Sequence, residues 1–334
     1  MRPTFKGNSY SLTPIAETGE RFSDFAPYVS AIDNRGVVAF QAALTDGGSG
    51  VYTSEGGRVT TVADSATGPF AGVSSHPAIN SGGSCCFYAT LGPEGQGVFV
   101  VHDGETTAAS GSAGPLGTTM NEAGAIAFRA PTDAGHNGVF LYDGDAVTTI
   151  ADTTGRFTGF HGLPVVAGDG TVIFRADVEG GEEGIYFGDG ETATVVVATG
   201  GTFGSLGPVP SANDAGTVAF CATLRAGGAG VFTAMRGEII TVIDTSGAFE
   251  SFRGALLDGS GRCVFYGTPR GGGLGLFAGP DPETDCLLAV GSPLLGSTVA
   301  GFALNPVSIN DAGQLAVRVA LLDGRQLMIR ADPG

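Results

Sequence analysis

Seven equivalent positions in this chain carry the side chains best suited to holding an anionic ligand. Each directly follows the residue, a phenylalanine in six cases, that ends a short apolar run, and together they are Gln41, Tyr88, Arg129, Arg175, Cys221, Tyr266 and Arg318. The neighbouring residues are small and apolar, so a large polar group at this one place requires an explanation. Guanidinium, phenol and amide groups donate hydrogen bonds, and arginine can pair with a carboxylate through two parallel bonds. The arginines and the glutamine are therefore candidate substrate-binding residues for a carboxylate-bearing molecule.

Two of the four histidines are candidates for moving a proton. His76 and His161 stand at equivalent places early in their repeats. Histidine titrates near neutral pH, and a tyrosine hydroxyl is a further candidate acid or base. The candidate catalytic set is His161, His76, Tyr88 and Tyr266. The substrate-binding set is completed by Arg253 and Tyr28, which occupy comparable positions in other repeats, as does Asn305.

The elements that must position these side chains come from a sequence repeated seven times. In six copies a glycine precedes a phenylalanine by four residues, and a second aromatic residue follows twelve residues later, as in Gly124, Phe128 and Phe140. The seventh copy is degenerate, with Val317 and Ile329 in the aromatic places. Successive copies are 41 to 52 residues apart. Repeats of this length, built from short apolar runs and glycine-rich turns, predict an all-β fold, a seven-bladed β-propeller.

One repeat, residues 205–245, shows how a blade should be built. Turn sequences divide it into strands at 208–212, 217–224, 231–234 and 239–244, which predicts an antiparallel meander of four strands. The second strands are apolar on both faces, as expected for a sheet that lies between two others.

The two ends of the chain complete one another. The last repeat supplies three strands between residues 306 and 329, whereas residues 12–17 match the fourth strands at 59–64 and 147–152. We therefore predict that the N- and C-terminal strands pair within the seventh blade, which closes the ring and leaves no open edge. The whole chain, 1–334, is then a single domain.

Strand direction divides the predicted molecule into two faces. The Asn-x-x-Gly turns should lie on the lower face, and the loops after the second and fourth strands on the upper face, around the mouth of the channel. Binding sites favour such a mouth, because loops from several blades converge there. His161 should follow a loop that holds Phe157 and Phe160. The arginines should lie between blades near the upper face, either in ion pairs with acids of the next blade or as donors to an anionic ligand.

The turn motif carries a family resemblance. A complete Asn-x-x-Gly-x-x-Ala-Phe sequence stands at 121–128 and 213–220, and nearly complete copies stand at 80–87 and 310–317. Asp33, Ala167 and Asp258 replace the asparagine in the other three copies. The chain resembles the bacterial tandem-repeat proteins that are named for this motif. The resemblance covers essentially the whole chain and implies a repeated fold, but no shared activity.

Composition excludes several classes of function. The net charge is −17 and Lys6 is the only lysine, so this acidic protein should repel nucleic acid and anionic membranes. No apolar stretch of about 18 residues is present, and residues 1–20 lack a basic-then-apolar leader. The five cysteines lack a Cys-x-x-Cys pair and are expected as small buried residues. We expect a cytoplasmic monomer.

We expect neither a metal nor a cofactor. The Asp-Gly pairs suit hairpin turns, and calcium loops, zinc motifs, phosphate loops and dinucleotide fingerprints do not occur. Two functions stay open. One is a cofactor-independent lyase, cyclase or hydrolase that acts on a small anionic substrate at the top of the channel, which the set of donors favours. The alternative is a non-enzymatic scaffold for protein interaction, which the lack of a catalytic motif favours.

Overall fold

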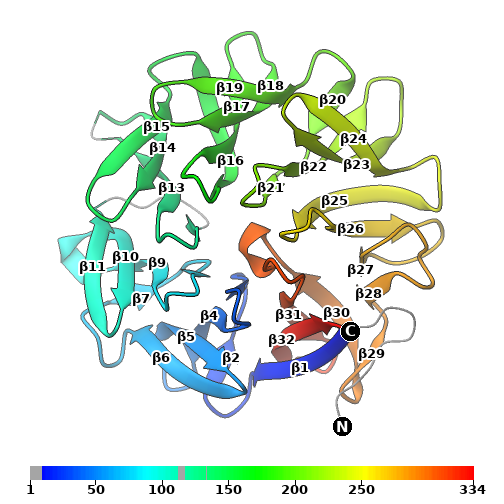
Figure 1. Ribbon diagram of the computed structural model, residues 1–334. Coiled ribbons are helices and arrows are strands. Elements are labelled where there is room, and N and C mark those ends of the chain that lie inside the picture. The colour runs from blue at the N-terminus through cyan, green and yellow to red at the C-terminus, as the bar shows by residue number, and fades with distance from the viewer. Residues whose placement is uncertain (1–9, 112–116, 133) are drawn as a thin grey trace.

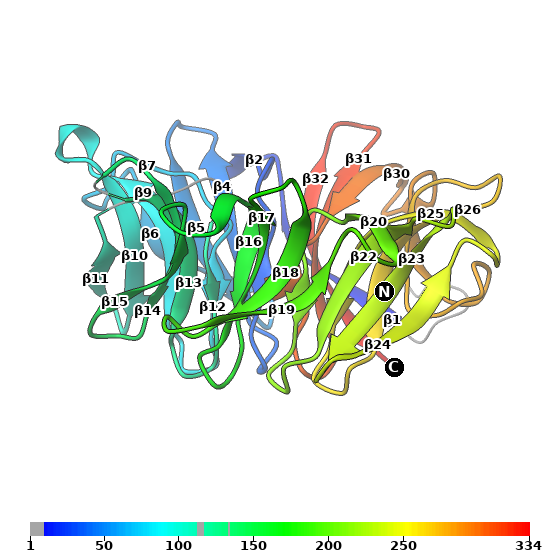
Figure 2. The same ribbon diagram turned by 90° about the horizontal axis from the view of Figure 1, so that it is seen from above.

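The computed structural model describes residues 10–111, 117–132 and 134–334 as seven small antiparallel sheets arranged around a central axis (Figure 1). Seen from the side, the strands run between the two faces of a disc (Figure 2). The predicted seven-bladed β-propeller is confirmed. The helices of the described residues are the single turns η1 (Gly92–Glu94) and η2 (Pro306–Ser308), so none is long and apolar enough to cross a membrane.

The first three blades follow the chain from the N-terminal side. Blade 1 contains β2 (Phe22–Asp24), β3 (Ala31–Ile32), β4 (Val38–Leu44), β5 (Ser49–Glu55) and β6 (Arg58–Asp64). Blade 2 contains β7 (Gly72–Val73), β8 (Ala78–Ile79), β9 (Cys85–Thr90), β10 (Gln96–His102) and β11 (Glu105–Ser110). Blade 3 contains β12 (Thr119–Met120), β13 (Ile126–Pro131), β14 (Asn137–Tyr142) and β15 (Val147–Asp152).

The next three blades repeat the same meander. Blade 4 contains β16 (Phe157–Val166), β17 (Val172–Val178), β18 (Glu183–Gly188) and β19 (Ala193–Ala198). Blade 5 contains β20 (Phe203–Leu206), β21 (Ser211–Ala212), β22 (Val218–Leu224), β23 (Ala229–Met235) and β24 (Glu238–Asp244). Blade 6 contains β25 (Phe249–Leu257), β26 (Cys263–Pro269), β27 (Gly275–Phe277) and β28 (Cys286–Ala289).

The seventh blade joins the two ends of the chain. It contains β29 (Pro293–Leu294), β30 (Ser297–Ala303), β31 (Leu315–Leu321) and β32 (Gln326–Pro333), and β1 (Tyr10–Glu17) is its outer strand. β1 pairs with β32 from Tyr10 opposite Pro333 to Glu17 opposite Leu327. The predicted closure of the ring by both ends of the chain is confirmed, and Figure 1 shows the blue and red strands side by side.

The recurring aromatic pair is a cross-strand contact. The twelve-residue spacing places Phe128 opposite Phe140 and Phe220 opposite Phe232 in the strand registers. Their ring centroids lie 5.6 Å apart in both blades, with the rings nearly parallel. The lead phenylalanines are almost fully buried between neighbouring sheets, which confirms that the second strands are apolar on both faces.

The innermost strands begin earlier than the sequence indicated. Phe157 and Phe160 belong to β16 and pair with β17, so the predicted loop before His161 is wrong. The two rings pack against Phe174 of the next strand, and this burial extends the sheet towards the upper face. In the seventh blade the first strand is β30, because Asn305 caps the single turn η2 at the place where a strand was predicted.

The Asn-x-x-Gly turns on the lower face tie each blade to the next. In the four copies with asparagine, Oδ1 accepts the main-chain N–H of the residue four positions later. The side-chain amide then donates to a carbonyl of the next blade: Asn80 to Glu122 (3.5 Å), Asn121 to Ala167 (2.9 Å), Asn213 to Asp258 (3.2 Å) and Asn310 to Asp33 (2.8 Å). The glycine of the motif has a φ of +76° to +89° in these turns, which explains its presence.

Candidate functional site

Most of the polar residues that follow the lead phenylalanines reach across to the main chain of the next blade. The donated bonds are Gln41 Nε2 to the Val73 carbonyl (3.3 Å), Tyr88 Oη to Arg129 (3.1 Å), Arg129 Nη1 to Gly162 (3.0 Å) and Tyr266 Oη to Leu304 (3.2 Å). The acceptors are main-chain carbonyls of the next blade, not the acidic side chains that the ion-pair interpretation requires. Gln41 is buried at the blade interface, so its role there is structural.

Arg175 differs from this pattern because it has an acidic partner. Its Nη2 donates to Glu183 Oε2 at 2.7 Å within blade 4, and the same oxygen accepts the main-chain N–H of Leu206 in blade 5 at 3.4 Å. The ion pair therefore links the two blades through the carboxylate. Arg175 Nε is buried and has no hydrogen-bond partner in the described part of the chain.

Arg318 differs from the other two arginines of the set, because the described residues provide no hydrogen-bond acceptor for its guanidinium. Its guanidinium makes no hydrogen bond or ion pair with the described residues, and its Nε is buried. Burial lowers the pKa of this guanidinium, while the charges of Asp24 and Tyr266 oppose that shift. A buried donor without a partner is costly, so a ligand that accepts its hydrogen bond would be stabilised.

His161 and Asp177 form a dyad on the upper half of blade 4. His161 Nε2 lies 2.7 Å from Asp177 Oδ2, and the two side chains are 40% and 34% exposed. Strand β16 places His161 opposite Arg175 on β17, and Asp177 lies two residues further along β17. The three side chains thus share the face of the sheet that points towards blade 5. A carboxylate that holds an imidazole in this way orients the ring.

His76 is less suited to acid–base chemistry. Its Nδ1 accepts the main-chain N–H of Val29 at 2.9 Å, and its ring packs edge-on against Tyr28 at 5.4 Å between centroids. Burial, together with the nearby charge of Arg318, lowers the pKa of His76 to about 4. The imidazole is therefore neutral near pH 7, and its proton resides on Nε2.

The two tyrosines of the candidate catalytic set hold blades together. Tyr266 Oη donates to the carbonyl of Leu304 and accepts the N–H of the same residue at 2.5 Å, and burial raises the pKa of this phenol. Tyr88 Oη donates to Arg129 of the next blade. Hydroxyls engaged in this way are poor proton donors to a substrate.

An upper pocket opens where blades 5, 6 and 7 meet. It has a volume of about 250 Å³, and its lining includes Arg253, Tyr266, Phe302, Leu304 and Asn305. Asn305 Oδ1 accepts the N–H of Val307, whereas its Nδ2 is buried and has no partner among the described residues. The exposed Arg253 and this amide are two donors in one pocket.

The upper pocket connects to blade 4 through the main chain. A side chain at Gly162 would clash with the carbonyl of Pro208, which lines the pocket, so the two blades touch there. Gly162 also accepts the bond from Arg129 and follows His161. Gly162, the residue that follows His161, therefore lies against the wall of the upper pocket.

The lower mouth of the channel has the opposite charge. Glu122, Asp214 and Asp311 line it, and burial, followed by the charges of the other two, raises the pKa of Asp214. Apolar residues such as Ile79 and Leu257 also line this opening. An anionic ligand would be repelled from the mouth of the channel on this face and attracted to the arginines at the upper end.

Sequence reasoning missed the partners of the predicted residues. Asp177 could have been found, because it lies two residues after Arg175 and alternation along a strand places both on one face. The sequence indicated only that Asn305 occupies a position comparable to those of Arg253 and Tyr28. No neighbouring residue predicts that its side-chain amide is buried. In the described part of the chain, no group of three or more His, Cys, Asp and Glu side chains is arranged to hold a metal ion.

Comparison with known structures supports the fold. PorZ, a surface component of the type-IX secretion system of Porphyromonas gingivalis, matches with a TM-score of 0.53 and 16% identity over 93% of this chain and 47% of PorZ. This chain therefore spans about half the length of that protein. An oligogalacturonate lyase in complex with manganese matches with a TM-score of 0.60 and 12% identity over 100% of this chain and 96% of the lyase. The polysaccharide lyase Uly1 matches with a TM-score of 0.54 and 10% identity over 95% of this chain and 92% of the lyase. Identities this low show a shared fold alone.

No curated protein matches this chain in sequence. A family model does match: it covers residues 16–236, about two thirds of the chain, and is described as a family of unknown function, DUF7453. The chain belongs to this family, DUF7453, whose function is not known.

Proposed function

We propose that this propeller binds a small carboxylate-bearing molecule at its upper face and acts on it as a cofactor-independent enzyme of the lyase, cyclase or hydrolase type. The observation that carries the proposal is Asn305 Nδ2 in the upper pocket, which is buried and has no hydrogen-bond partner among the described residues, together with Arg253 in the same pocket. A carboxylate would accept hydrogen bonds from both groups and satisfy the buried donor. Arg318, in the same blade as Asn305, adds a cation whose buried Nε has no hydrogen-bond partner in the described part of the chain.

The acid–base part of the proposal rests on His161. Its Nε2 lies 2.7 Å from Asp177 Oδ2, so the carboxylate would accept the Nε2 proton, orient the ring and leave Nδ1 as the nitrogen that takes up a proton. A step that the three reaction types share is removal of a proton: from carbon next to a carboxylate in a lyase, from an internal nucleophile of the substrate in a cyclase and from water in a hydrolase. His161 would take that proton, and the neighbouring arginines would stabilise negative charge on the substrate.

Binding can be tested with succinate as a generic dicarboxylate probe, by calorimetry and by soaking crystals. Asn305→Asp keeps the oxygen that caps η2 but replaces the donor by an acceptor and adds a negative charge. We expect at least about tenfold weaker binding in this variant. Asn137→Asp, which makes the same charge change at an exposed position of blade 3, is the control and should bind normally. Equal affinities for the two variants would refute the upper pocket as the binding site.

Catalysis can be tested with a panel of acidic oligosaccharides and hydroxy acids. Oligogalacturonate is a suitable first substrate because it bears carboxylates and names one of the enzymes with a similar fold. Turnover should fall by about 10²-fold or more in His161→Asn, whereas His102→Asn on an outer hairpin should retain activity. We expect activity to persist in EDTA. Loss of activity with loss of a stoichiometric metal would contradict a cofactor-independent mechanism.

A second candidate, a scaffold for protein interaction, is favoured by the outer strand of blade 5. Ile239, Ile240 and Val242 on β24 are 41%, 55% and 41% exposed. An apolar edge strand of this kind is able to pair with another chain. If the panel yields no turnover and no binding, association through β24 becomes the leading function.

A further inference from the structure

A second pocket lies on the lower face between blades 4 and 5, on the opposite side of the molecule from the upper pocket. It has a volume of about 380 Å³. Phe187 of β18 and Met235 of β23 give it apolar surface, and Thr171 and Thr194 add hydroxyl groups. Ala167, Ala215 and Gly216 stand at its walls, and these small residues leave space in front of the phenyl ring.

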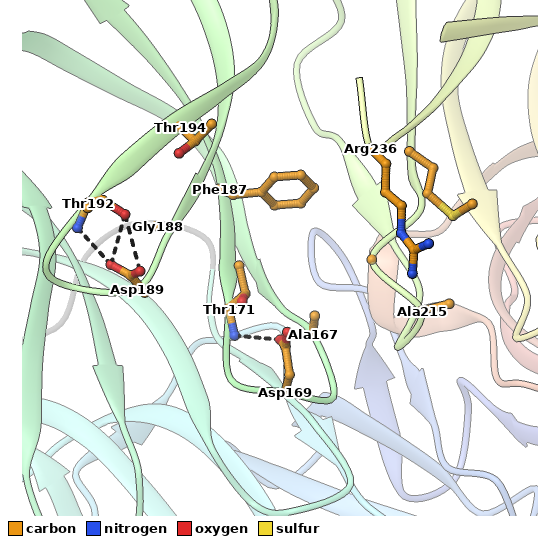
Figure 3. Close-up of a pocket in the computed structure, with 12 residues that line it drawn as sticks. Ala167, Asp169, Thr171, Phe187, Gly188, Asp189, Thr192, Thr194, Ala215 and Arg236 are labelled. Atoms are coloured by element: carbon orange, nitrogen blue, oxygen red, sulfur yellow. Dashed lines mark hydrogen bonds between the residues drawn. The ribbon is translucent and has the colours of Figure 1, made fainter. Parts of the chain in front are cut away.

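Arg236 brings a positive charge to this pocket. It stands in the hairpin between β23 and β24, and Figure 3 shows its side chain on the opposite side of the pocket from Phe187. The guanidinium makes no hydrogen bond or ion pair with any described residue, although the protein carries a net charge of −17. It is therefore available to a ligand.

The backbone of Arg236 is in an unfavourable conformation for this residue. Its φ is +51° and that of Gly237 is +85°. The matching hairpin of blade 1 has Gly56 and Gly57 in these places, and that of blade 2 has Asp103 and Gly104, with nearly the same φ angles. Glycine and aspartate tolerate this conformation better than arginine does. An arginine at a strained turn position, with its side chain at a pocket, indicates a function for that side chain.

The remaining charges define the ligand further. Asp169 and Asp189 stand at the edge of the pocket away from Arg236, as Figure 3 shows for Asp189. Hydrogen bonds from the main-chain N–H groups of Thr192 and Glu191 lower the pKa of Asp189, so this carboxylate stays charged. A second anionic group on the ligand would therefore be repelled.

We propose that this lower pocket binds a small aromatic molecule that carries one carboxylate. The ring packs against Phe187 and Met235, and the carboxylate pairs with Arg236. The two aspartates select against dicarboxylates. The inference does not rest on the proposed enzymatic function, since the upper pocket shares no residue with this one.

The methionines offer a direct test by nuclear magnetic resonance of the intact protein. The chain has four methionines, and Met235 is the one that lines this pocket, whereas Met328 is fully buried in blade 7. With ¹³C-methyl-labelled methionine and 3-phenylpropanoate as probe, ring currents should shift the Met235 signal saturably and leave Met328 unchanged. The signal is assigned with Met235→Leu. No shift of Met235 up to the solubility limit of the probe would overturn the proposal.

Probe chemistry and variants then separate the two contacts. Propanoate, which lacks the ring, and 3-phenylpropanol, which lacks the charge, should each bind at least about tenfold more weakly, as should phenylsuccinate with its second carboxylate. Arg236→Gly should weaken 3-phenylpropanoate binding by about tenfold or more while keeping the melting temperature within about 3 °C, because glycine relieves the strained φ. Asp103→Gly, at the same turn position in blade 2, is the matched control and should bind like the parent.

One further variant tests whether the lower pocket binds its ligand independently of the upper pocket. Asn305→Asp should leave the Met235 response to 3-phenylpropanoate unchanged, whatever it does to succinate binding. Retained affinity in Arg236→Gly, or equal affinity for 3-phenylpropanol, would show that the pocket does not recognise the carboxylate and would overturn the proposed ligand class.

Discussion

At the scale of single residues, the asparagine of the repeated turn has two tasks. Its oxygen organises its own turn, and its amide binds the next blade. Where aspartate replaces it, only the first task remains, and an arginine follows close by: Arg35 Nε lies 3.0 Å from Asp33, and Arg262 Nε lies 2.8 Å from Asp258. The cation compensates for a buried carboxylate that has no amide group to donate.

If arginine compensates for the aspartate, stability that is lost by an asparagine-to-aspartate change in blade 5 should be partly restored by a neighbouring arginine. Asn213→Asp keeps the bond from the Thr217 N–H but loses the donation to Asp258, so the free energy of unfolding should fall by about 1–3 kcal/mol. Adding Thr217→Arg, at the position that Arg262 holds in blade 6, should restore part of the loss. Urea unfolding of the two single variants and the double variant measures the coupling. If Thr217→Arg changes the free energy of unfolding by the same amount in the parent protein and in Asn213→Asp, the arginine does not compensate for the aspartate.

His76 makes stability depend on pH. Its pKa is about 4 in the folded protein and near 6.5 when unfolded, so the unfolded chain takes up this proton first as the pH falls. The free energy of unfolding should therefore decrease between about pH 6.5 and pH 4, by up to about 3 kcal/mol from this group. His76→Asn, whose amide oxygen can still accept the Val29 N–H, should show a smaller decrease over the same range. Parallel pH profiles for the parent and this variant would contradict the assignment.

At the scale of elements, comparison of the fourth strands shows that the outer edge of blade 5 is unusually apolar. The position of Ile240 holds threonine in blades 1 to 4, at Thr60, Thr107, Thr148 and Thr194. These residues lie on the outer edge of each sheet, where a polar β-branched side chain suits both the strand and water. Blade 5 alone among these five has an isoleucine there.

Ile240→Thr should therefore cost little stability, within about 0.5 kcal/mol, because the side chain is 55% exposed. If β24 mediates association, the same change should abolish it, and sedimentation velocity on both proteins tests this. Thr148→Ile in blade 3 is the reciprocal variant. A melting temperature lowered by many degrees in Ile240→Thr would show that the residue packs within the fold.

At the scale of the whole molecule, closure of the ring is the feature on which every blade interface depends. β1 is paired along its length with β32, and Leu12 belongs to the core of the seventh blade. Removal of this strand would expose the edge of β32 and apolar surface around it.

Deletion of residues 1–17 should consequently destabilise the protein far more than its length suggests, with aggregation or a loss of several kcal/mol of unfolding free energy. Deletion of residues 1–9, which leaves every residue of β1 in place, is the control. Thermal unfolding and size-exclusion chromatography compare the three proteins. A monomeric protein without residues 1–17 that melts within a few degrees of the parent would contradict closure by β1.

The number of blades and the way the ring closes were determined by the sequence alone. Strand pairing within a blade is local, so the spacing between Phe128 and Phe140 already contains the register that brings their rings together. The match of residues 12–17 to other fourth strands likewise identified the outer strand of the last blade. Both inferences need only the alternation of residues along each strand and a count of the strands in each repeat.

Only the tertiary structure decided what the polar residues contact. Arg129 and Tyr266 point at carbonyls whose positions depend on how neighbouring blades tilt around the ring, and no pattern within one repeat contains that geometry. Burial is decided in the same way: it lowers the pKa of His76, and it leaves Asn305 Nδ2 without a hydrogen-bond partner among the residues that the structure describes, although neither residue is unusual in the sequence. The repeat therefore determines the fold, because its contacts are local, whereas the sites arise between repeats, where side chains meet residues that are distant in the chain.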